Sequence, residues 1–81
     1  MRITFDPAAD AAMIYLVDRV PDGGVARSEV CDVEFIGGAV ILDLDADDRL
    51  LAIEVLGASK LLPADVVAQA VSDRHGQDET A

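Results

Sequence analysis

The segment Ala39–Leu56 restricts the fold more than any other part of the chain, because strand alternation and turn residues agree there. A two-residue turn at Asp47 and Asp48 predicts a β-hairpin. In that register, apolar residues face one another across one side of the hairpin: Leu44 with Leu51, Leu42 with Ile53, and Val40 with Val55. A shift by one residue would turn carboxylates toward the core, so the alternation favours this register.

The other face of the predicted hairpin is mixed and suits partial exposure. Its cross-strand pairs are Asp45 with Leu50, Asp43 with Ala52, and Ile41 with Glu54. A two-residue turn of the favoured primed type needs positive φ angles, which Asp tolerates less well than Gly. We therefore expect some strain at the turn.

The rest of the chain predicts three more strands and a helix. The strands are expected at Arg2–Asp6, at Ala11–Asp18 and at Val25–Val33. Pro63 suits the first position of a helix that runs to about Arg74, with an apolar stripe of Leu62, Val66, Val67, Ala70 and Val71. These elements predict an α+β fold, an antiparallel β-meander of about five strands with one C-terminal helix packed on the sheet. Residues 1–75 would form a single domain, and residues 76–81 a disordered tail.

Composition narrows the possible partners and the cellular location. The net charge of -10 disfavours nucleic acid and anionic membranes, and it favours a basic protein or a cation. Hydrophobic residues make up 52% of the chain, although a domain this small buries only about 60% of its unfolded surface. This excess of aliphatic side chains indicates a homo-oligomer. The single cysteine and the lack of a signal peptide or membrane span predict a cytoplasmic location.

Three segments together resemble a known family. They are FDPAADAAMIYL, VARSE and AVILDLDADDRLLAIEVLGASKLL, within about Ile3 to Leu62, and they resemble the domain of unknown function 2283 family of small bacterial proteins. The resemblance implies a compact β-meander with a helix and supplies no catalytic residues. The chain departs from the family pattern at Asp48, where the family usually has Gly, and in VCDVEFIGG, which is longer than the usual link.

The acidic hairpin contains a candidate metal site. Asp43, Asp45 and Asp47 have the spacing of the first ligands of an EF-hand loop, and Glu54 has that of the last. However, Asp48 replaces the Gly of the sharp turn, the flanks are strands, and Glu54 would lie far from the hairpin tip. A solvated acidic edge that keeps the hairpin soluble is therefore the favoured interpretation, and cation binding is the alternative.

Other polar residues give no signal of catalysis, and no cofactor is predicted. Cys31 lacks a nearby His or second Cys, which favours a buried or half-buried structural thiol. His75 is expected at the surface near the end of the helix. Arg27 and Glu29 share one face of their strand, and a cross-strand ion pair is the default interpretation.

The leading hypothesis is a non-enzymatic protein-interaction module that forms a homo-oligomer or binds a basic protein. It depends on an apolar second face that one short helix cannot also cover, formed by Met13, Tyr15, Val17, Ala39 and Ile41. A divalent-cation-binding domain is the second hypothesis. An enzyme comes third, because so small a core cannot enclose a pocket within one chain.

Overall fold

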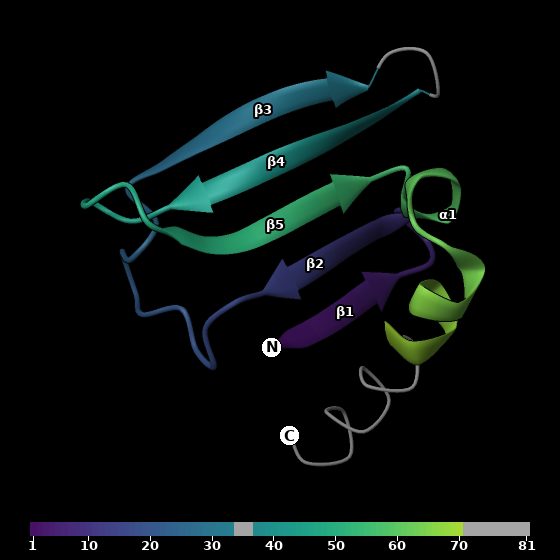
Figure 1. Cartoon of the computed structure of the whole chain (residues 1–81), viewed down its shortest axis with the longest axis horizontal. Coiled ribbons are helices and arrows are strands. Elements are labelled where there is room, and N and C mark those ends of the chain that lie inside the picture. The colour runs from purple at the N-terminus through teal and green to yellow at the C-terminus, as the bar shows by residue number, and fades with distance from the viewer. Residues whose placement is uncertain (34–36, 71–81) are drawn as a thin grey trace.

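A computed structural model describes residues 1–33 and 37–70 of the 81-residue chain. It contains five strands and a short helix (Figure 1), with bounds β1 Arg2–Asp6, β2 Ala11–Tyr15, β3 Arg27–Val33, β4 Gly38–Leu44, β5 Leu50–Leu56 and α1 Ala58–Leu61. A second helical stretch covers residues 64–70. Three predictions lie outside the described residues: the end of this helix near Arg74, the surface position of His75, and the tail.

The strands form one antiparallel sheet in the order β1-β2-β5-β4-β3, which confirms the predicted α+β class. Consecutive strands pair except at one point, where β2 pairs with β5 and not with β3. Consequently β1 and β3 are the two edges of the sheet (Figure 1). Strand β2 ends at Tyr15 and β3 begins at Arg27, so both are shorter than predicted.

The hairpin of β4 and β5 keeps the predicted register over most of its length. Leu42 lies opposite Ile53, and Val40 lies opposite Val55. At the tip the prediction is wrong, because Leu44 pairs with Leu50 after an irregularity in the register.

The turn itself explains the shift at the tip. The amide of Asp48 donates to the carbonyl of Asp45 at 3.1 Å, and the amide of Asp45 donates to the carbonyl of Arg49 at 2.9 Å. Among the residues between Asp45 and Arg49, Asp48 alone has a positive φ, 63°. A type I turn followed by one left-handed residue thus replaces the predicted two-residue turn. It needs positive φ at one residue, whereas a type I′ turn needs it at two, and no glycine is present here.

The core lies between one face of the sheet and the helical residues. Its buried cluster is formed by Phe5, Ala12, Val55, Ala58 and Ala70. Phe5 is paired with Ala12, and Ala12 with Val55, so these three side chains share a face. Partly buried Leu61, Leu62 and Val67 pack against them. The predicted apolar stripe is thus confirmed at Leu62, Val67 and the buried Ala70.

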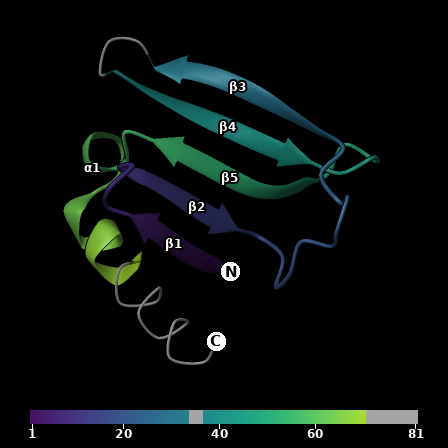
Figure 2. The same cartoon turned by 180° about the vertical axis from the view of Figure 1, so that it is seen from behind.

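The helical residues lie near one end of the sheet. Figures 1 and 2 place α1 beside the ends of β4 and β5 and the following helical stretch beside β1. Ile14 and Ile53 belong to the partly buried group around the core cluster, whereas Val40 and Leu42 on β4 are partly exposed without belonging to it. The helix therefore covers the face of the sheet that carries Ile53 and Val55. The helices of residues 1–33 and 37–70 include none with the length and hydrophobicity to cross a membrane.

Candidate functional site

The sheet face opposite the helix carries the predicted interaction residues. Met13 lies opposite Glu54, Glu54 opposite Ile41, and Ile41 opposite Val30, so these four side chains form one row across the sheet. Tyr15 lies two residues along the same strand, in the row next to this one. We call this surface, formed by Met13, Tyr15, Val30, Ile41 and Glu54, the open face.

The open face is only partly shielded from solvent. Met13, Tyr15, Ile41 and Glu54 are half-buried, and Val30 is 61% exposed. The buried core cluster and its helical residues lie on the other side of the sheet. Val17, also predicted for this surface, follows the end of β2 and is half-buried. The structure thus brings Met13, Tyr15 and Ile41 to one face.

Arg2 covers part of this surface in a way that the sequence did not reveal. Its guanidinium carbon lies 4.2 Å from the centre of the Tyr15 ring, a cation–π contact, and its Nη1 donates to the carbonyl of Asp18 at 3.0 Å. Arg2 and Tyr15 face each other across β1 and β2. The alternation within β2 predicts the face on which Tyr15 lies. The contact with Arg2 depends on the register between β1 and β2, which the sequence pattern does not give.

The candidate metal ligands each contact groups of the protein. Ser28 Oγ donates to Asp43 Oδ1 at 2.7 Å, and Asp43 is only 9% exposed. Asp45 Oδ1 accepts the amides of Asp47 at 2.8 Å and Arg49 at 2.9 Å. These two bonds anchor the turn through the side chain of Asp45.

Asp47 and Glu54 complete the predicted ligand set but lie apart. Asp47 Oδ2 lies 3.7 Å from Arg49 Nη2 in an exposed ion pair at the tip, whereas Glu54 lies on the open face opposite Met13. Within residues 1–33 and 37–70, no three His, Cys, Asp or Glu side chains gather as a metal-binding group.

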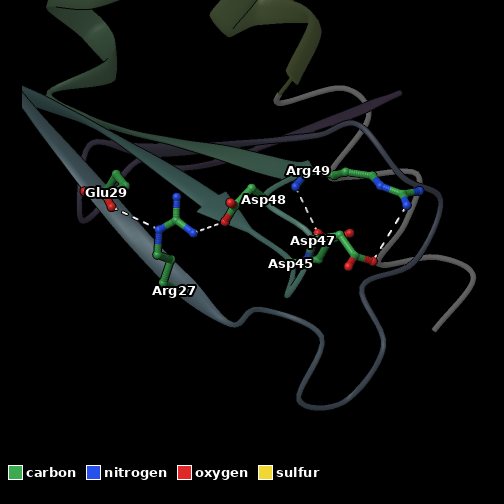
Figure 3. Close-up of polar contacts among 6 residues, drawn as sticks. All are labelled: Arg27, Glu29, Asp45, Asp47, Asp48 and Arg49. Atoms are coloured by element: carbon green, nitrogen blue, oxygen red, sulfur yellow. Dashed lines mark hydrogen bonds and ion pairs between the residues drawn. The ribbon is translucent and has the colours of Figure 1, made fainter.

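Arg27 links the edge strand to the hairpin tip. Figure 3 shows its guanidinium between Glu29 and Asp48, with Nε 3.0 Å from Glu29 Oε1 and Nη1 bonded to Asp48 Oδ1. The hydrogen bond to Asp48, and then that to Glu29, raise the pKa of Arg27 above its usual value. Glu29 belongs to the same strand as Arg27, and Asp48 is the partner that sequence reasoning missed. All three side chains are about half or more exposed, so the pairs orient the turn more than they stabilise the fold.

Cys31 differs from its prediction. It is a free, exposed cysteine, and the expectation of a buried or half-buried thiol is wrong. The reason is topological. Strand β3 is one edge of the sheet, and the helical stretch that follows α1 packs beside β1, at the opposite edge. Its sequence neighbours gave no sign of that position.

Comparison with known proteins assigns the family. A family model described as "Protein of unknown function (DUF2283)" matches residues 2–59, a stretch that contains all five strands. No curated protein and no solved structure gives a significant match. Because the family model covers well over half of the chain, the chain belongs to the DUF2283 family.

Proposed function

We propose that the chain is a small, acidic, non-enzymatic protein-interaction module that self-associates and works in the cytoplasm. The observation that supports it is the open face, where Met13, Tyr15 and Ile41 remain half-buried and Val30 is 61% exposed. An apolar sheet face that stays partly open to solvent is a feature of interaction surfaces, and self-association is the simplest way to cover it.

The charge of the chain favours a basic protein as a further partner. The chain has a net charge of -10, and the open face carries Glu54 near its centre. Apolar contacts around a carboxylate suit a basic, partly apolar surface, because opposite charge steers encounter while apolar burial supplies affinity.

Light scattering after size-exclusion chromatography tests self-association. At micromolar concentration we expect a mass of at least two 8.5 kDa chains. The double variant Met13→Thr/Ile41→Thr should shift the mass toward one chain, because it removes apolar area while placing at both positions a β-branched residue that suits a strand. The control Val25→Thr changes a side chain that is 40% exposed and precedes β3. A wild-type monomer at every concentration would contradict the proposal.

The basic partner is tested separately by capture. Tagged wild-type chain and the Met13→Thr/Ile41→Thr variant are each incubated with native cell extract, and bound proteins are identified by mass spectrometry. The proposal predicts a basic protein that the wild type retains and the double variant loses. Equal retention by both would mean that the open face is not its binding surface.

Cation binding through Asp43, Asp45 and Asp47 is the alternative function, and calorimetry distinguishes the two. A native-state ligand must raise the melting temperature, because it binds the folded chain alone. Heat of binding together with a raised melting temperature in millimolar Ca²⁺ or Mg²⁺ would favour the alternative. We expect neither, because the three carboxylates already contact Ser28, backbone amides and Arg49.

A further inference from the structure

Strand β3 forms one edge of the described sheet. It spans Arg27–Val33 and pairs with β4 alone in the described sheet. Each side chain from Arg27 to Cys31 is exposed. An edge strand presents one row of backbone donors and acceptors to solvent, and a strand from another chain can pair with that row.

Val30 is the middle residue of β3, and its apolar side chain is exposed. Three residues of the strand precede it and three follow it. Its 61% exposure leaves an apolar side chain open to solvent in the centre of an edge strand, between the charged residues Glu29 and Asp32.

Two of the three charged residues of β3, Arg27 and Glu29, form ion pairs within the chain. Arg27 pairs with Glu29 at 3.0 Å and also with Asp48. A second strand could therefore approach this edge without facing an isolated charge at Arg27 or Glu29.

We propose that β3 pairs with β3 of a second copy of this chain, antiparallel, about a twofold axis at Val30. This inference rests on the proposed self-association and adds a second contact to it, because pairing at the β3 edge leaves the open faces free to pack against another copy. An axis normal to the sheet keeps the open faces of both copies on the same side. It places Val30 opposite Val30, Glu29 opposite Cys31 and Ser28 opposite Asp32, so that all seven residues of the strand are paired.

Neighbouring registers are less favourable. An axis at Glu29 would set two carboxylates directly opposite each other, which destabilises a strand pair. An axis at Cys31 would shorten the ladder and place Val30 opposite Asp32. Only the axis at Val30 combines the full length of β3 with an apolar pair at its centre.

The pairing would also join the two open faces. Val30 lies opposite Ile41 on β4, so a Val30 pair on the axis would connect the apolar rows of both copies. One continuous sheet would then present an apolar surface across the whole dimer.

Disulfide cross-linking tests the register. In the variant Val30→Cys/Cys31→Ser, the two cysteines lie directly opposite each other, at a Cα separation of roughly 4.5–5.5 Å that a disulfide can span. We expect a covalent dimer under mild oxidation. The variant Glu29→Cys should also cross-link, through the native Cys31 of the second copy.

The wild-type chain is the matched control for the register. Its two Cys31 residues would lie on a diagonal, with Cα atoms roughly 7–8 Å apart, so they should cross-link far more slowly. Fast cross-linking of the wild type with none in Val30→Cys/Cys31→Ser would overturn the axis at Val30.

A charge on the axis tests the surface without cross-linking. Val30→Asp should raise the dissociation constant of the β3-paired dimer at least roughly tenfold, because two carboxylates would face each other. Val25→Asp adds the same charge outside the strand and should leave the constant unchanged. Circular dichroism verifies that both variants are folded.

The outcomes separate this inference from the proposed function. If Val30→Asp keeps the mass of the wild type while Met13→Thr/Ile41→Thr lowers it, the β3 pairing is wrong and self-association through the open face stands. A monomeric wild type would contradict both the proposed self-association and the β3 pairing.

Discussion

Asp10 and Ser59 are joined by two hydrogen bonds across 49 residues of sequence, with Ser59 N 2.9 Å from Asp10 Oδ1 and Ser59 Oγ 2.7 Å from Asp10 Oδ2. The carbonyl of Asp10 also accepts the amides of Gly57 and Ala58, at 2.9 and 3.0 Å. One residue of the turn between β1 and β2 thus binds the first turn of α1. This contact fixes where the chain leaves the sheet, and with it the position of the helical residues over Phe5 and Val55.

Removing the Ser59 hydroxyl should weaken this junction. Ser59→Ala is expected to lower the free energy of unfolding by about 1 kcal/mol, since it deletes a hydrogen bond to a carboxylate. Asp10→Asn should cost a similar amount, and asparagine keeps the tolerance for the φ of 51° at this position. Urea denaturation measures both.

A double-mutant cycle and a neighbouring variant verify that the cost arises from the contact. Ser59→Ala combined with Asp10→Asn should cost less than the sum of the two single changes, because both disrupt the same pair. Lys60→Ala, the next position of α1, should change stability by less than about 0.5 kcal/mol. Strict additivity would show that the two residues do not act together.

Substitutions at Asp48 should differ in melting temperature according to how well each new residue tolerates a left-handed backbone. Its φ is 63°, a region that costs an alanine roughly 1 kcal/mol and a glycine nothing. We therefore expect Asp48→Ala to lower the melting temperature, Asp48→Asn to leave it nearly unchanged, and Asp48→Gly to raise it. Differential scanning calorimetry of the series checks the order. If Asp48→Asn fell as far as Asp48→Ala, the ion pair with Arg27 would be the main contribution instead.

Local pattern was sufficient to predict the hairpin, and it failed where distant segments meet. The pairs Leu42 with Ile53 and Val40 with Val55 follow from alternation within one short stretch. The pairing of β2 with β5 is a long-range choice, and it decides that β3 is an edge and that Cys31 is exposed. Strand alternation predicts which side chains share a face of the sheet, but it does not predict which strands are neighbours. The apolar face of Met13 and Ile41 was therefore predictable, and the contact of Arg27 with Asp48 was not.

Gly38 is a position where any side chain should conflict with the junction of the helix and sheet. A Cβ atom there would lie 2.7 Å from the carbonyl oxygen of Leu56 and 2.7 Å from Leu61 Cδ1. Gly38→Ala should therefore lower the free energy of unfolding by about 1–3 kcal/mol, measured by urea denaturation. Adding Leu61→Ala should restore only part of the loss, because the backbone oxygen of Leu56 remains. Full restoration would mean that the Leu61 side chain alone causes the conflict.

Ser28 should stabilise the chain through the carboxylate that it binds. Asp43 is 9% exposed, and Ser28 Oγ lies 2.7 Å from its Oδ1, so removal of the hydroxyl leaves a largely buried acceptor without this donor. We expect Ser28→Ala to lower the free energy of unfolding by about 1–2 kcal/mol. Ser28→Thr keeps the hydroxyl and adds a β-branched residue suited to a strand, so it should remain close to the wild type. Equal losses in both variants, measured by urea denaturation, would show that the hydroxyl does not stabilise Asp43.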